Sequence, residues 1–92
     1  MVVAVAERIV RVVNPLGLHA RPSAEFVKLA SQFHSDVSLE KDGMLVNGKS
    51  IMGVMTLAAE CDCELRIHTE GDDAEVAAES LADLVNRGFA EK

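Results

Sequence analysis

A histidine and an arginine two residues apart are the side chains best placed for chemistry. His19 follows the turn Leu16-Gly17-Leu18 and directly precedes Ala20-Arg21-Pro22. Proline is tolerated in the first turn of a helix, so we expect a helix to begin beside His19. The first N–H groups of a helix have no partner within it and bind anions, and its positive end favours neutral, nucleophilic imidazole. This arrangement can hold a phosphoryl group covalently on His19, with Arg21 as a charge-assisted donor.

A structural role is the simpler interpretation of the same histidine. Helix starts commonly contain polar residues, so His19 is also compatible with a local cap or a surface position. The other two histidines have plainer surroundings and predict no catalysis. His34 is expected at the C-terminal end of the first helix, where a positive charge is favourable, and His68 on the solvent side of a strand.

The strands that must position His19 are indicated by alternating or β-branched sequences. These sequences occupy residues 8–13, 36–41, 44–46 and 64–70. Asn14-Pro15-Leu16-Gly17 ends the first strand with turn residues, and Asp42-Gly43 predicts a two-residue hairpin between the second and third. Val37 and Leu39 face one side of their strand, as do Leu65, Ile67 and Thr69 of theirs.

Helical spacing of apolar residues predicts three helices. The first covers residues 20–33, with Phe26, Val27, Ala30 and Phe33 on one face. Ser50 caps a short second helix that carries Ile51, Met52, Val54 and Met55. The last helix starts after Gly71-Asp72-Asp73, buries a stripe of Ala77, Leu81, Leu84 and Val85, and ends with Gly88 as its C-cap. The order β-α-β-β-α-β-α predicts an α+β fold: an antiparallel sheet of four strands with three helices on one face.

Length and charge limit the classes of function. We expect 92 residues to form a single domain (1–92), too small to include an enzyme's separate substrate domain. The net charge of −6 argues against a general nucleic-acid binder, and the acidic residues are concentrated in the C-terminal third. No segment has the ~20 apolar residues that cross a bilayer, so no membrane insertion is expected.

Two cysteines, Cys61 and Cys63, are separated by one residue. A disulfide across so small a ring is strained, which favours a reducing compartment, and we expect a cytoplasmic protein. Two thiolates fall short of a structural zinc site, so neither a metal nor another cofactor is predicted. Cys63 is expected to be half-buried at the start of the fourth strand.

Two motifs resemble a known family. Leu16-Gly17-Leu18-His19-Ala20-Arg21-Pro22, followed by Lys49-Ser50-Ile51-Met52-Gly53-Val54-Met55-Thr56-Leu57, is similar to HPr, the histidine-containing phosphocarrier of the phosphoenolpyruvate-dependent phosphotransferase system. The resemblance extends from about residue 7 to residue 88 and includes the spacing of the motifs. It implies an open-faced β-sandwich and a phosphoryl carrier with no independent turnover.

The resemblance also implies roles for individual residues. His19 matches the histidine that accepts a phosphoryl group on Nδ1 from phosphorylated enzyme I and passes it to an enzyme II A domain, here expected to serve sugar uptake. Arg21 matches the arginine that steadies this group, and Ser50 the serine modified by HPr kinase/phosphorylase in lineages that have that enzyme. The family usually has a glycine where Asp62 stands, and aspartate tolerates the left-handed conformation that such a turn requires.

Partner binding is expected on an exposed surface near His19. It comprises Leu18, Ala20, Lys49, Ile51, Met52 and Met55. Methionine adapts to partners of different shape, although core packing is the ordinary role of such apolar residues. We expect a monomer, because no partner interface requires more.

Two other functions remain open from the sequence. A regulatory interaction module of the same fold would act through Ser50 and the apolar surface without phosphotransfer, but such relatives lack the histidine. An acylphosphatase-like hydrolase has similar size and α/β content, but no suitable asparagine or arginine loop is evident. Phosphate incorporation from phosphoenolpyruvate and enzyme I would separate these functions from a carrier.

Overall fold

The computed structural model describes residues 4–90, and within them four strands form one sheet. The strands are β1 (Ala4–Arg11), β2 (Asp36–Lys41), β3 (Met44–Asn47) and β4 (Glu64–Gly71). The described chain also forms the helices α1 (Ala20–Ala30), α2 (Ile51–Thr56) and α3 (Ala74–Asn86), and a short 3-10 helix, η1 (Gly88–Ala90). The predicted order β-α-β-β-α-β-α is confirmed for these strands and α-helices.

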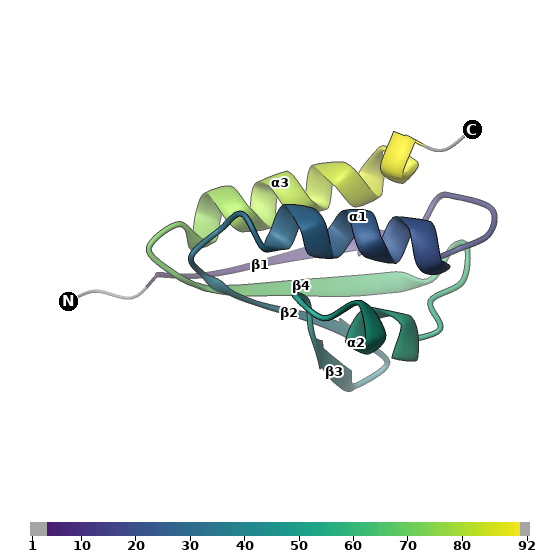
Figure 1. The fold of residues 1–92 in the computed structure, drawn as a ribbon, viewed down its shortest axis with the longest axis horizontal. Helices are drawn as coiled ribbons and strands as arrows, with labels where there is room; N and C mark the ends of the chain where they lie inside the picture. The colour runs from purple at the N-terminus through teal and green to yellow at the C-terminus, as the bar shows by residue number, and fades with distance from the viewer. Residues whose placement is uncertain (1–3, 91–92) are drawn as a thin grey trace.

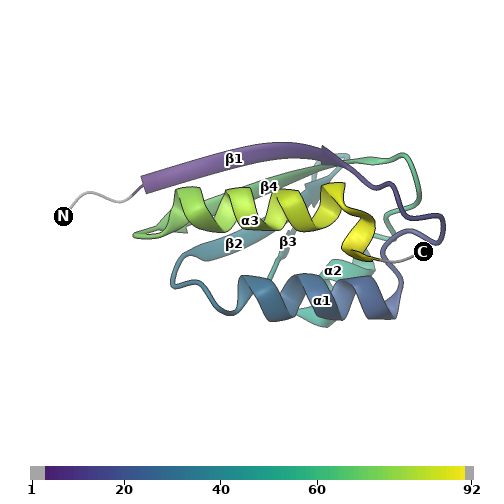
Figure 2. The same ribbon diagram turned by 90° about the horizontal axis from the view of Figure 1, so that it is seen from above.

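The sheet has the strand order β1-β4-β2-β3, and each neighbouring pair is antiparallel. The helices α1 and α3 lie side by side across one face of this sheet (Figures 1 and 2). The shorter α2 lies beside the N-terminal half of α1 and close to β3. No helix in the described part of the chain combines the length and apolar character needed to cross a membrane. Because α1 and α3 lie on one face of a four-stranded antiparallel sheet, the predicted open-faced arrangement is observed.

Buried and more exposed residues alternate along β2 and β4, and the buried ones form the part of the core that lies under the helices. Val37 and Leu39 of β2 are buried, as are Leu65, Ile67 and Thr69 of β4, as predicted. The helices cover them with fully buried side chains, including Phe26 of α1 and Leu81 and Val85 of α3. Burying each such large apolar side chain contributes roughly 1.5–3 kcal/mol, so this layer fixes α1 and α3 firmly on the sheet.

Two predicted element boundaries are wrong. The first strand starts at Ala4 and ends at Arg11, instead of covering residues 8–13. Its buried residue near the start is a small alanine, Ala6, which packs against Ala74 and Ala78 of α3. The first helix ends at Ala30 instead of residue 33, so His34 lies in the following turn and its N–H donates to Asp73 Oδ2 at 2.8 Å.

The predicted turns are confirmed. Asp42 and Gly43 have φ values of 50° and 86°, a conformation that suits a two-residue hairpin. Gly88 follows α3 with φ 66°, the left-handed geometry that ends helices at glycine. Of the stripe predicted on this helix, Ala77, Leu81 and Val85 are buried, but Leu84 is only partly buried.

Candidate functional site

His19 lies at the junction between the loop after β1 and the start of α1. Gly17 has φ +66°, a backbone conformation that suits glycine, and its N–H donates to the Asn14 carbonyl at 3.0 Å. Asn14 closes the same turn, because its Nδ2 donates to the Gly17 carbonyl at 2.6 Å. These two hydrogen bonds fix the conformation of the turn and therefore the direction of the backbone at His19.

The His19 backbone forms the N-cap of α1. Its φ and ψ are −73° and −171°, and its carbonyl accepts the first helical hydrogen bond, from the Ser23 N–H at 3.0 Å. The side chain makes no capping hydrogen bond, so the predicted alternative role as a side-chain cap is not observed. The imidazole is partly exposed, while its Nε2 is covered by protein.

The first turn of α1 provides donors beside this imidazole. The N–H groups of Ala20 and Arg21 precede the first helical hydrogen bond and therefore have no partner within the helix. Pro22, the third residue of the helix, has no N–H. The Arg21 side chain is exposed and forms no ion pair within residues 4–90. Two amide donors and one guanidinium can thus meet an anion that is bound to the ring.

A second loop supports the turn that carries His19. The Leu18 N–H donates to the Ala59 carbonyl at 2.8 Å, and the neighbouring Asp62 N–H donates to the Val12 carbonyl at 2.7 Å. Asp62 has φ +73°, so it adopts the left-handed conformation that was predicted for an aspartate in place of glycine at this turn. In Figures 1 and 2 this loop before β4 runs beside the loop after β1. Sequence reasoning missed this support, because main-chain pairing between distant loops leaves no pattern in the residue types.

Ser50 is the N-cap of α2, as predicted. Its Oγ accepts a hydrogen bond from the Gly53 N–H at 3.1 Å. The preceding Lys49 is partly buried, and its Nζ donates to the Phe33 carbonyl at 2.8 Å, just beyond the end of α1. The Lys49 ammonium therefore helps hold the second motif against the first helix.

The outer side of α2 is apolar and exposed. Ile51, Met52 and Met55, named here the α2 patch, are 43%, 75% and 40% exposed. The prediction that Leu18 belongs to an exposed patch is wrong, because Leu18 is 4% exposed and packs in the core. Leu16, on the other side of Gly17, is 78% exposed instead. Ala20 is exposed as expected.

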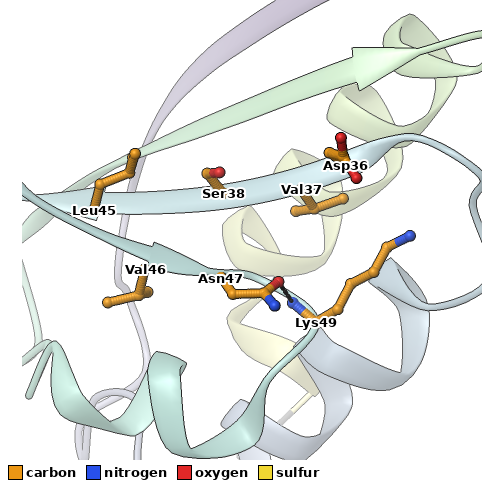
Figure 3. Close-up of a pocket in the computed structure, with 7 residues that line it drawn as sticks. All are labelled: Asp36, Val37, Ser38, Leu45, Val46, Asn47 and Lys49. Carbon is orange, nitrogen blue, oxygen red and sulfur yellow. Dashed lines mark hydrogen bonds between the residues drawn. The ribbon is translucent and has the colours of Figure 1, made fainter.

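A separate shallow hollow lies between β2 and the end of β3 (Figure 3). Its volume is about 480 Å³, and it is lined by Asp36, Val37, Ser38, Leu45, Val46, Asn47 and Lys49. Within it, the Asn47 Oδ1 accepts a hydrogen bond from the Lys49 N–H at 2.9 Å. Of the predicted site residues, only Lys49 contributes to this lining, so the hollow is distinct from the His19 region.

The remaining titratable residues have structural contacts. On the open face of the sheet, His68 Nδ1 lies 2.9 Å from Glu7 Oε2 and its Nε2 lies 3.0 Å from Glu40 Oε1, a bridge across three strands that hydropathy did not predict. Cys61 and Cys63 are free, and burial raises the pKa of the Cys63 thiol. Cys63 is half-buried directly before β4, as predicted. Within residues 4–90 no group of three or more histidine, cysteine or acidic side chains could hold a metal ion.

Comparisons with known proteins agree on one family. Residues 6–87 match the family model described as "PTS HPr component phosphorylation site". The chain is 46% identical over 82 residues to the phosphocarrier protein HPr of Neisseria meningitidis serogroup A / serotype 4A, which covers 89% of this chain and 92% of that protein.

Solved structures extend the similarity to the fold. A phosphocarrier protein HPr from Bacillus anthracis has a TM-score of 0.85 and 50% identity, over 89% of this chain and 98% of that one. An HPr dimer from Thermoanaerobacter tengcongensis has a TM-score of 0.75 and 48% identity, over 82% of this chain and 86% of that one. Both resemblances are far above the level at which only the fold would be shared.

Proposed function

The chain belongs to the HPr family of phosphocarrier proteins of the phosphotransferase system, and from this premise we propose that His19 carries the phosphoryl group. As a phosphocarrier it is not an independent catalyst. We propose phosphorylated enzyme I as the donor and the A domain of an enzyme II as the acceptor, in a cytoplasmic relay that serves sugar uptake.

The burial of one ring nitrogen of His19 bears on which nitrogen takes part in the transfer step. Because Nε2 of His19 is buried, attack on phosphorus falls to Nδ1. A nitrogen–phosphorus bond forms as the bond between phosphorus and its donor atom on enzyme I breaks, and the electron pair of the broken bond stays with enzyme I. The second transfer repeats this exchange with the A domain as acceptor. Such transfers depend mainly on positioning and on electrostatic stabilisation of the moving group.

The observation that carries this proposal is the partly exposed His19 imidazole beside the first turn of α1. The amides of Ala20 and Arg21 and the guanidinium of Arg21 supply positive electrostatic potential where a phosphoryl group would lie. The group stays near solvent, so a second protein can reach it. A carrier needs this accessibility, because both its donor and its acceptor are other proteins.

Docking is proposed on the α2 patch together with Ala20 and Lys49. The three apolar side chains of the α2 patch are exposed and belong to a helix that lies beside the start of α1. Phosphorylation of Ser50 by an HPr kinase/phosphorylase would add about −1.5 to −2 charges at pH 7 to this surface. The expected consequence is weaker docking of partners without unfolding, since the added charge lies at the positive end of α2.

The proposed working form is a monomer with one His19 site per chain. The dimer known for the Thermoanaerobacter tengcongensis protein makes the oligomeric state worth measuring, by sedimentation at several concentrations. A dimer that buries His19 or the α2 patch would contradict the proposed docking surface.

Phosphotransfer is tested by incubation with enzyme I and radiolabelled phosphoenolpyruvate. We expect phosphate on the chain that is labile in acid and stable in alkali. His19→Ala should abolish this labelling, and Ser50→Ala should retain it as a matched control. Retention of label in folded His19→Ala protein would overturn the assignment of His19, and absence of label in the folded wild-type chain would overturn the carrier function.

A further inference from the structure

The loop that supports His19 is itself fastened to the sheet by one side chain. Lys41, the last residue of β2, donates from Nζ to the carbonyl oxygens of Leu57 at 3.2 Å and Ala58 at 3.4 Å. These carbonyls are at the C-terminal end of α2, where the helix dipole is negative and a cation is favourable. Lys41 therefore joins the end of β2 to the start of the segment 58–63, named here the support loop.

The support loop has little conformational freedom where Lys41 holds it. Ala58 has φ +49°, a left-handed conformation that costs an L-amino acid roughly 1–2 kcal/mol. A residue kept in this conformation needs contacts that define it, and the Lys41 ammonium provides one at the Ala58 carbonyl. The next carbonyl, that of Ala59, is the one that accepts the Leu18 N–H. The Lys41 contact and the contact that fixes the His19 turn are thus on adjacent residues.

The other end of the support loop is tied to β1 and its extension. Val12 and Cys63 are joined by an N–H···O bond of 3.0 Å, and Arg11 Nη1 donates to the Asp62 carbonyl at 2.6 Å. The approach of the two loops is close enough that a Cβ on Gly17 would lie 2.3 Å from the Ala59 oxygen. With this packing, a displacement of Ala59 must displace Leu18, and with it the backbone of His19.

We propose that Lys41 is a positioning residue for phosphotransfer: it holds the support loop so that the Ala59 carbonyl fixes Leu18 and the His19 imidazole next to it. This inference rests on the proposed role of His19 and extends it to a residue on a different strand. The α2 patch should keep its place without Lys41, because the buried side chains of Val54 and Leu57 hold α2 in the core. The expected effect is therefore on the transfer rate more than on docking.

Kinetics of Lys41→Gln with phosphorylated enzyme I separate these two effects. We expect kcat to fall about tenfold with KM changed less than twofold, since displacements of about 1 Å can slow positioned reactions strongly. Lys41→Arg, which retains a cation and N–H donors, should restore most of the rate. Lys28→Gln is the matched control: it removes one positive charge from an exposed position on α1 and should leave both constants unchanged.

Amide hydrogen exchange tests the structural link without phosphotransfer. In Lys41→Gln the Leu18 amide should exchange at least several-fold faster, while the amides of Leu65 and Ile67 in β4 keep their protection. Equal acceleration of all three amides, or an unchanged Leu18 rate, would overturn the positioning role, as would an unchanged kcat. Failure of the wild-type chain to accept phosphate would instead contradict the carrier function, and the exchange result would still decide whether Lys41 fixes Leu18.

Discussion

Replacing Gly17 with alanine tests whether close approach of the two loops positions His19. Gly17 has φ +66°, and an added Cβ would lie 2.3 Å from the Ala59 oxygen, a distance that real Cβ atoms do not adopt. One loop must move, and the hydrogen bond from the Leu18 N–H to the same oxygen must lengthen or break. Gly43→Ala is the matched control, because Gly43 also has positive φ, at +86°, but an added Cβ there meets nothing within 4 Å.

The expected loss of stability follows from these two environments. A left-handed L-residue costs roughly 1–2 kcal/mol, and reduced freedom of the unfolded chain returns about 0.4–1 kcal/mol. Gly43→Ala should therefore lower the free energy of unfolding by about 1 kcal/mol. Gly17→Ala carries the same cost and also loses a hydrogen bond worth about 0.5–1.5 kcal/mol, so its total should be about 1.5–2.5 kcal/mol.

Thermal unfolding followed by far-ultraviolet circular dichroism measures this difference. The chain has no Trp and no Tyr, so intrinsic fluorescence is a poor probe. For a domain of this size, a difference of about 0.5–1.5 kcal/mol lowers the midpoint temperature of Gly17→Ala by about 2–12 °C relative to Gly43→Ala. At a temperature where both variants are folded, phosphate transfer to His19 should be slower in Gly17→Ala only.

Equal midpoint temperatures for the two variants would refute the reasoning, because the steric and hydrogen-bond costs at Gly17 would then be absent. A Gly17→Ala variant that is destabilised as expected but accepts phosphate at the wild-type rate would refute a narrower point. In that case the loops would pack closely without controlling the orientation of His19.

Three further substitutions test local features of the fold. Hydrogen bonds, first from the Ser35 hydroxyl and then from the His34 N–H, lower the pKa of Asp73 from 3.8 to about 2, so this carboxylate stabilises the fold above about pH 4 and the benefit disappears as the pH falls through 2. Asp73→Asn should therefore lower the urea midpoint much more at pH 7 than at pH 2, and an equal loss at both would contradict this. Ser50→Ala should lose about 1 kcal/mol of stability in urea unfolding, and no loss would mean that the cap is not significant. Asp62→Gly should gain about 0.5–1 kcal/mol in the same assay by relieving a φ of +73°, and a loss would show that the Asp62 side chain has a role of its own.

Local signals allowed much of the fold to be predicted from the sequence. Asp42-Gly43 specifies its hairpin because both residues tolerate positive φ, and the Ser50 cap is local to one turn. The start of β1 was missed because its buried residue, Ala6, is small, whereas the larger side chain of Val5 is 66% exposed. Hydropathy alternation fails where a small residue faces a closely packed helix.

The orientation of side chains around His19 could not be predicted in the same way. Leu16 and Leu18 are identical residues on either side of Gly17, yet Leu16 is exposed and Leu18 is buried. The choice depends on the left-handed backbone at Gly17 and on the hydrogen bond from Leu18 to Ala59, forty-one residues farther along the chain. The local motif indicates which residue types form the site, whereas distant loops determine where those residues point.

A phosphoryl carrier must hold its cargo firmly enough to keep it and weakly enough to release it. Tighter binding of the phosphorylated state would lower the energy of that state and raise the barrier to onward transfer. Pro22 limits the helix start to the amide donors of Ala20 and Arg21, and the exposed Arg21 guanidinium remains in contact with water, which weakens its attraction for the phosphoryl group. The rigid components are the backbone turn and the support loop, which fix the ring. The loops thus determine the position of the His19 ring, and solvent access keeps the binding of the phosphoryl group weak enough for onward transfer. Position and binding strength are therefore set by different residues.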